Sequence, residues 1–216
     1  MGAVFIMEKI ITDLELQKKN PNRINVYLDH EFAFGISRFV GAWLKQGEKL
    51  DELSITQLLE KDTREKAFQK AFQFINYRPR SVHEVKEKLK ELGFGESIID
   101  DVANELLNKK YLNDYEFAEN WIASRVQSKP RSQEMLRYEL RKKLIPESII
   151  EEALILAPNN NELALRLGKK YLRRFAHLNE KEFTKKMTGV LARRAFPFSV
   201  IATVLMELKN IRNESI

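Results

Sequence analysis

A repeat of 51 residues constrains the fold of this 216-residue chain more than any other feature of its sequence. The tripeptide Pro79-Arg80-Ser81 recurs as Pro130-Arg131-Ser132, and a Glu-Ser-Ile-Ile sequence occurs at residues 96–99 and again at 147–150. A further step of 51 residues keeps leucine in register at positions 89, 140 and 191, although the Pro-Arg-Ser tripeptide is lost. A fixed period indicates tandem structural units, and a degenerate last unit is typical of a terminal repeat.

Each repeat has the hydrophobic spacing of three short helices. In the first repeat, one helix is predicted to begin at residues 62–63, and a second follows the capping box formed by Ser81 and Glu84. Gly93 is expected to end the second helix before a third begins, and Asn113 to cap the first helix of the next repeat. Helices this short do not bury their apolar faces alone, so neighbouring repeats are expected to stack.

The N-terminal part follows a different period. Apolar residues alternate with polar ones within Ile10–Leu16, Ile24–Leu28 and Phe32–Ile36. Period two predicts three strands, with a loop at Lys18–Asn22 and a two-residue hairpin turn at Asp29-His30.

Two short helices, opened by Ser37 and Ser54 and ending near Glu60, are expected to follow these strands. The predicted fold is mainly α: three tandem three-helix repeats in an elongated, curved array, preceded by a small β-meander and helical module. The expected domains are residues 1–62 for this N-terminal module, and 63–112, 113–158 and 159–216 for the three repeats.

The positive charge is concentrated in one part of the chain. The whole chain has 37 basic and 31 acidic residues, whereas residues 121–194 alone hold 17 basic and 8 acidic ones. Such a block attracts phosphates or an acidic protein surface, although a merely solvated basic face would look the same.

Several of these cations occupy patterned positions. In the helix predicted near residues 162–176, Arg166, Lys170 and Arg173 share one face, and Arg174 lies beside it. In the middle helix of the second repeat, Arg137 has Glu134 as a possible partner, whereas Arg141 has no acid at helical spacing and is expected to be unpaired. Unpaired arginines suit phosphates and carboxylates because of their fork geometry.

Aromatic residues within this block allow two interpretations. Trp121 and Tyr138 could stack on nucleic-acid bases. Trp121 directly precedes Ile122, which lies 51 residues after Ala71, however, and a core role is favoured for Trp121.

Catalytic constellations are not found in the sequence. It has no cysteine, no phosphate-binding glycine loop and no His-Glu-x-x-His motif, and its three histidines are far apart. Asp100-Asp101 recurs as Glu151-Glu152 near a helix start, where carboxylates favour the helix dipole, so we interpret both pairs as structural. The longest apolar run near the C-terminus, Val200–Met206, is too short to span a bilayer. We expect a cytoplasmic protein that is not an enzyme, has no metal, cofactor or membrane contact, and is a monomer.

A longer motif carries a family resemblance. It comprises Phe72, the run Arg78-Pro79-Arg80-Ser81, then Glu84, Leu89 and Gly93-Phe94, followed by Ile98-Ile99, Tyr111-Leu112-Asn113-Asp114 and Phe117-Ala118. This pattern resembles the RecX family of recombination regulators over residues 63–212, and the N-terminal module resembles an extension of longer members.

The resemblance implies three tandem three-helix repeats and a binding role without catalysis. It implies partners in the RecA recombinase and its filament on DNA, with suppression of strand exchange, ATP hydrolysis and co-protease activity, and also binding to DNA. A general DNA- or RNA-binding repeat protein is the alternative, and filament capping and groove binding both stay open. Arg80 and Arg131 are either contacts or anchors of the turn before each middle helix. The candidate RecA- and DNA-binding residues are Arg80, Arg125, Arg131, Arg137, Arg141, Arg166, Lys170, Arg173, Arg174, Arg193 and Arg194.

Overall fold

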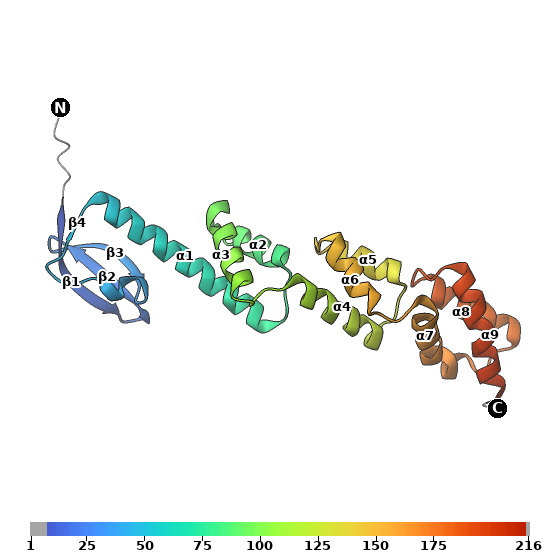
Figure 1. Ribbon diagram of the computed structural model, residues 1–216. Coiled ribbons are helices and arrows are strands. Elements are labelled where there is room, and N and C mark those ends of the chain that lie inside the picture. Colours follow the sequence, from blue (N-terminus) through green and yellow to red (C-terminus); the bar gives the residue numbers. More distant parts are fainter. Residues whose placement is uncertain (1–7, 215–216) are drawn as a thin grey trace. The chain divides into compact units, whose positions relative to one another are not determined.

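The structure, a computed structural model, describes residues 8–214. They form two compact units, one with the residues up to 78 and 85–111, the other with residues 79–84 and those from 112 onward. The first unit begins with an antiparallel sheet in the order β3-β2-β1-β4 (Figure 1). Its strands are β1 (Lys9–Gln17), β2 (Asn20–Leu28), β3 (Glu31–Ser37) and β4 (Lys49–Leu50).

The three predicted strands are confirmed, and in β2 the predicted alternation accounts for the buried face. In β1 the predicted alternation is wrong: Ile10 and Leu16 are exposed and Ile11 is buried, with a register shift between Ile11 and Asp13. Ile11, Ile24, Val26, Leu28 and Ile36 all lie in one core with Leu50, which belongs to the short strand β4 that the sequence pattern did not predict.

The two hairpin turns differ in how well they were predicted. The turn at Asp29-His30 is confirmed, and both residues have positive φ, at 51° and 73°, as a type I′ turn requires. The loop expected over Lys18–Asn22 is wrong: β2 already begins at Asn20, which pairs with Gln17, so only a two-residue turn separates the strands.

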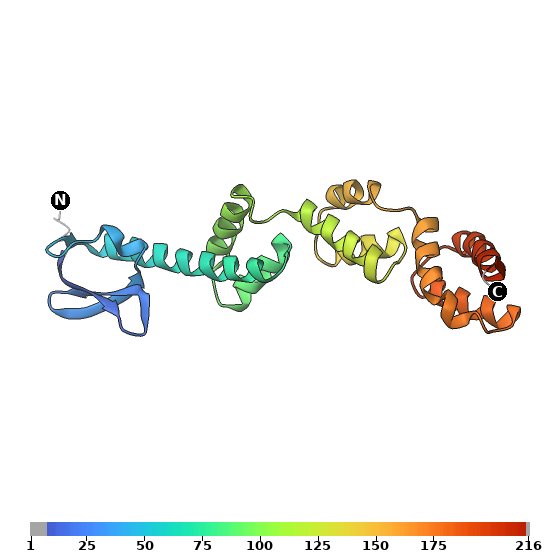
Figure 2. The same ribbon diagram turned by 90° about the horizontal axis from the view of Figure 1, so that it is seen from below.

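The helices expected between Ser37 and Tyr77 are also arranged differently. The helix opened by Ser37 is only the 3-10 turn η1 (Val40–Trp43), in which the Val40 N–H donates to Ser37 Oγ. The helix expected to end near Glu60 and the one expected from residues 62–63 are a single helix, α1 (Glu52–Tyr77), capped by Asp51 (Figures 1 and 2). No glycine or proline lies between Glu52 and Tyr77, so nothing breaks the helix there. The expected domain boundary between residues 62 and 63 therefore falls inside α1.

Eight further helices complete the described part of the chain, and with α1 they form three sets of three, as predicted. Their bounds are α2 (Val82–Glu91), α3 (Glu96–Asn108), α4 (Asp114–Ser128), α5 (Gln133–Arg141), α6 (Glu147–Ile155), α7 (Asn160–Phe175), α8 (Glu180–Ala192) and α9 (Phe198–Glu214). The predicted caps are confirmed: Ser81 Oγ accepts from the Glu84 N–H, and Asn113 Oδ1 accepts from two N–H groups of α4.

The backbone carries the 51-residue register into the third repeat. The turn between the second and third helices has positive φ at Gly93 (84°), and again at Leu144 (52°) and Ala195 (59°). In each turn, the next residue donates to the carbonyl of a fully buried leucine, Leu89, Leu140 or Leu191, at 3.2 to 3.4 Å. This is a helix-ending motif of the Schellman type, and its recurrence shows that the turn geometry persists where glycine has been lost.

Within the second unit, successive repeats are joined by two hydrogen bonds that each span 62 residues, one from a side chain and one from the backbone of the corresponding serine. Ser81 Oγ donates to the Lys143 carbonyl at 3.3 Å, and the Ser132 N–H donates to the Arg194 carbonyl at 3.0 Å. Because both serines are completely buried, these bonds satisfy polar groups that would otherwise be costly.

Candidate nucleic-acid interface

The basic face predicted on α7 is present but is not uniform. Arg166, Lys170 and Arg173 are exposed, whereas Gly168 and Phe175 on the other side are buried. Lys170 Nζ donates to the backbone carbonyls of Gln127 and Ser128 at the end of α4, at 2.5 and 3.2 Å.

Lys170 therefore closes the C-terminus of another helix, a favourable place for a cation because the last carbonyls of α4 lack helical partners. Arg166 lines a separate hollow of about 480 Å³ together with residues of α4 and α6. The three side chains share a face, but they do not act as one site.

A groove between α7 and α8 brings other cations together. This α7–α8 groove has a volume of about 790 Å³, and its walls include the aromatic residues Tyr171 and Phe175. Its cationic side chains are Arg174, Lys185, Lys186 and Arg193, with His177 beside them.

The four Lys and Arg side chains of the groove are exposed, and none forms an ion pair within residues 8–214. Glu182 is the one acidic residue in the lining. Two predicted residues, Arg174 and Arg193, meet here, whereas Lys185 and Lys186 were missed as site residues. Their spacing with Glu182, Gly189 and Arg193 places them on one face of α8, which was the available signal.

The cations of the second repeat have a different environment, because they surround one carboxylate. Glu139 accepts from Arg125 Nε at 3.0 Å and from the Trp121 indole N–H at 2.9 Å, and it also pairs with Arg131. The Arg125 guanidinium lies over the Trp121 ring at 4.1 Å, and Lys143 Nζ lies 5.4 Å from the same ring.

This environment bears on Trp121 and Arg131. Trp121 packs at the edge of the core, stacked on Phe117, so the core interpretation is the one the structure favours. The Arg131 side chain is only 11% exposed. Burial, and then the nearby charges of Arg125 and Arg194, lower its pKa from the ordinary arginine value. A guanidinium held this way anchors the turn before α5; Arg80, at the equivalent position before α2, is half-buried.

Arg137 and Arg141 are paired, so the expectation of an unpaired Arg141 is wrong. Arg141 Nε donates to Glu147 Oε2 at 2.7 Å, and Arg137 also pairs with Glu147. Both pairs lower the pKa of the Glu147 carboxyl, Arg141 having the larger effect. Glu147 lies six residues after Arg141 and begins α6, so the pair crosses a turn. Glu134, the expected partner of Arg137, accepts from Asn160 Nδ2 instead.

Asp100-Asp101 and Glu151-Glu152 do not lie in the first turn of α3 or α6, where the acidic residues are Glu96 and Glu147, so the helix-dipole role expected of both pairs is not found; the first member of each pair forms an ion pair instead. Asp100 pairs with Lys86 at 2.7 Å, and Glu151 lies 3.6 Å from Arg137; these two ion pairs occupy equivalent repeat positions. Over the described range, no three His, Cys, Asp or Glu side chains converge as a metal site. No described helix is long and apolar enough to cross a membrane.

The fold and these surfaces define the class of this chain: a tandem three-helix-repeat protein with an N-terminal sheet and a basic groove in its last repeat. Family models agree with it piece by piece. Residues 9–51 match the regulatory protein RecX N-terminal domain, 67–106 the first three-helix domain of RecX and 113–154 the second.

Individual relatives extend the match along the chain. A regulatory protein RecX of Bacillus velezensis is 35% identical over 90% of this chain and 76% of its own length. That of Bacillus subtilis is 32% identical over 94% and 79%. A crystal structure of regulatory protein RecX superposes with a TM-score of 0.72 at 27% identity, over 91% of this chain and 98% of that one. The structure of RecX from Lactobacillus salivarius gives 0.60 at 26% identity, over 69% and 98%. The chain belongs to the RecX family of regulatory proteins.

Proposed function

We propose that this protein is a non-enzymatic regulator in the cytoplasm that binds the RecA recombinase and RecA–DNA filaments. By doing so it lowers ATP hydrolysis, strand exchange and co-protease activity, and so modulates recombination and the SOS response. Membership of the RecX family supports the partner. The observation that carries the DNA contact is the α7–α8 groove, whose four cationic side chains have no carboxylate partner among the described residues.

The proposed mechanism needs no chemical step on a substrate. Tandem repeats offer several surfaces on one chain, and several weak contacts on one filament add avidity without any single strong site. A chain that holds neighbouring RecA protomers and DNA together slows the cycle of ATP turnover, because turnover requires the subunits to shift. The groove supplies the DNA contact, since lysine and arginine side chains that neutralise phosphates release counterions.

The test compares two pairs of lysines. Lys185→Gln/Lys186→Gln removes two charges from the groove, whereas Lys90→Gln/Lys110→Gln removes two exposed lysines that form no ion pair in the described chain. RecA ATPase activity on single-stranded DNA is measured with each variant. We expect the groove variant to inhibit several-fold less than the wild type and the control to inhibit fully.

Each failure has its own meaning. Full inhibition by a folded groove variant removes the groove from the site. A wild-type protein that binds DNA but leaves RecA turnover unchanged contradicts the regulator and favours the general nucleic-acid-binding protein.

A further inference from the structure

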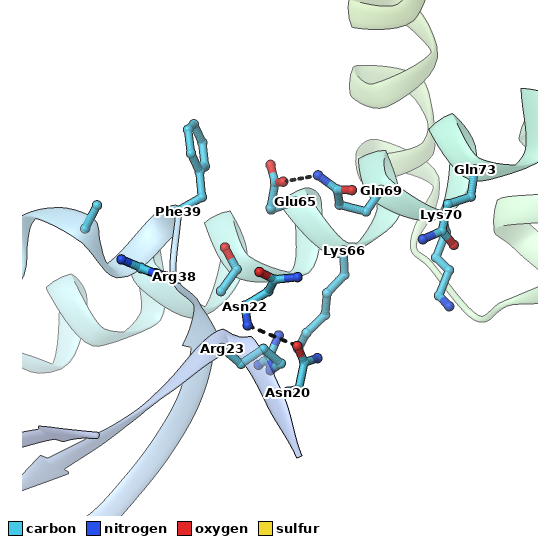
Figure 3. A pocket seen from close by; sticks show the side chains of 12 residues that line it. Asn20, Asn22, Arg23, Arg38, Phe39, Glu65, Lys66, Gln69, Lys70 and Gln73 are labelled. Atoms are coloured by element: carbon cyan, nitrogen blue, oxygen red, sulfur yellow. Dashed lines mark hydrogen bonds between the residues drawn. The ribbon is translucent and has the colours of Figure 1, made fainter. Parts of the chain in front are cut away.

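A second polar hollow lies in the first unit, far in sequence from the basic block. It has a volume of about 860 Å³ and lies between α1 and the ends of β2 and β3 (Figure 3). Its lining is rich in amides and cations: Asn20, Asn22, Gln69 and Gln73 supply the amides, and Arg23, Arg38, Lys66 and Lys70 the positive charges. Part of this lining lies within residues 9–51, which match the RecX N-terminal domain, but neither that match nor the proposed RecA contact gives the hollow a role.

Two of the four cations belong to the scaffold of this hollow. The Asp62 carboxylate is buried in α1, where it accepts from Arg23 and from the Ser37 N–H and pairs with Lys66. Burial raises the pKa of Asp62, but Lys66, Arg23 and the Ser37 N–H together keep it below its usual value. This network fixes α1 against the sheet and uses the charges of Arg23 and Lys66.

The other two cations are available for a ligand. Arg38 and Lys70 are exposed, and within residues 8–214 neither side chain has an ion-pair partner. Glu65, the acidic residue of the lining, accepts from Gln69. The hollow therefore keeps a positive surface, although residues 1–62 have two more acidic than basic residues.

Exposed aromatic rings lie beside these cations. Phe39 is 76% exposed and lines both this hollow and a neighbouring one of about 350 Å³, which Trp43 also lines. Trp43 is 84% exposed. Phe39 and Trp43 line the same neighbouring hollow, and exposed apolar side chains that adjoin one another, unlike isolated ones, are typical of binding surfaces.

We propose that this hollow and its aromatic edge bind single-stranded nucleic acid. Bases stack on Phe39 and Trp43, the phosphates contact Arg38 and Lys70, and the amides bind base edges. Stacking on aromatic rings together with cations along the backbone is the general mode of sequence-tolerant single-strand binding. A duplex is the poorer fit, because its bases already stack on each other. An acidic peptide would use the cations, and its backbone could hydrogen-bond the amides, but Asp and Glu side chains have no planar ring to stack on Phe39 and Trp43.

The reporter for this site is Trp43, which is remote in sequence from the α7–α8 groove. The full-length protein is titrated with oligo(dT) of about 15 nucleotides, with the matched duplex, and with polyglutamate of equal charge. Tryptophan fluorescence is compared with that of Trp43→Phe, which keeps an aromatic ring but removes this reporter. We expect oligo(dT) to quench the Trp43 share of the emission, at a lower concentration than the duplex does.

Variants then test the two kinds of contact. Phe39→Ala is expected to lower the affinity for oligo(dT), measured by Trp43 quenching, about fivefold or more. Phe198→Ala, at another exposed phenylalanine, should leave this affinity unchanged. Arg38→Ser/Lys70→Ser should lower the salt slope of binding by about 1.4. Thermal melting checks that each variant is folded.

Equal quenching by polyglutamate or by duplex, or no Trp43 quenching at all, overturns the proposal. The RecA ATPase test is independent of this result. Inhibition of RecA without Trp43 quenching removes only this site, and quenching without inhibition removes only the proposed regulator.

Discussion

The second and third repeats share one backbone plan but use their cations in opposite ways. In α4–α6, Arg125 and Arg131 surround Glu139, and Arg137 and Arg141 meet at Glu147. In α7 and α8, the arginines and lysines of the groove have no such partners within the described range. Fold and charge are therefore separable: the repeat register determines the turns and the leucine core, whereas the position of a few carboxylates decides which cations are free to bind.

The largest loss of folding stability is expected from substitutions at a position where the two repeats are alike. Leu140 and Leu191 are both fully buried at the same repeat position. Leu140→Ala should lower the free energy of unfolding by about 3 kcal/mol, and Leu191→Ala by a similar amount, because each leaves a cavity beneath an equivalent turn. Urea denaturation measures both. A loss below about 1 kcal/mol at either site would mean that the repeats are not packed alike.

A smaller effect should separate the repeats. Glu139→Gln removes the charge that Arg131 and Arg125 share, and we expect a loss of about 2 kcal/mol because Arg131 is largely buried. Glu182→Gln, in the α7–α8 groove, should change stability by less than about 0.5 kcal/mol. The same denaturation experiment compares them, and equal losses would contradict the different roles assigned to the two carboxylates.

The smallest change in folding stability is expected at one helix-start position, which is Asp114 in the second repeat and Asn160 in the third. Asp114 Oδ1 accepts from the Val82 N–H at 2.9 Å, and Asn160 Oδ1 accepts from the Gln133 N–H at 2.8 Å in the following repeat. Burial raises the pKa of Asp114, so the folded state penalises its charged form. Asp114→Asn keeps the acceptor and should stabilise the protein by about 0.5 kcal/mol at pH 7.

The pH dependence follows from the sign of that shift. A raised folded pKa means that the folded wild type binds its proton more tightly than the unfolded chain does. The loss of stability caused by the charged Asp114 carboxylate is complete above the folded pKa. It disappears as the pH falls below the unfolded pKa of 3.8, because the carboxyl is then protonated in both states. The advantage of Asp114→Asn should therefore vanish below that pH in melts at several pH values. An advantage that grows in acid would contradict this cause.

Local signals predicted much of the fold. Ser81 caps α2 as its sequence spacing requires, Ser132 caps α5 at the equivalent position, and the leucine register identified a third repeat that lacks the Pro-Arg-Ser tripeptide. The continuity of α1 was missed because Asp62 is equally suited to cap a helix or to pair inside one. Its buried contact with Arg23 depends on packing against the sheet.

The candidate site was less predictable, because charge pairing depends on contacts between elements. Helical spacing finds partners three or four residues apart, so it could not find Glu147 for Arg141 across a turn or the carbonyl partners of Lys170 on another helix. Arg174 and Arg193 line the same groove only because α7 packs on α8, and helical spacing within the sequence does not reveal that packing. Composition located the basic block, but only the structure separates its paired cations from its unpaired ones.

The most direct test of this separation is the salt dependence of duplex DNA binding. Lys185→Gln/Lys186→Gln and Arg137→Gln/Arg141→Gln each remove two positive charges, the first from the α7–α8 groove and the second from the Glu147 pairs. We predict that the first variant lowers the slope of log affinity against log salt by about 1.8 and that the second leaves the slope unchanged. Equal reductions in the two folded variants would show that DNA responds to net charge alone and would contradict the account.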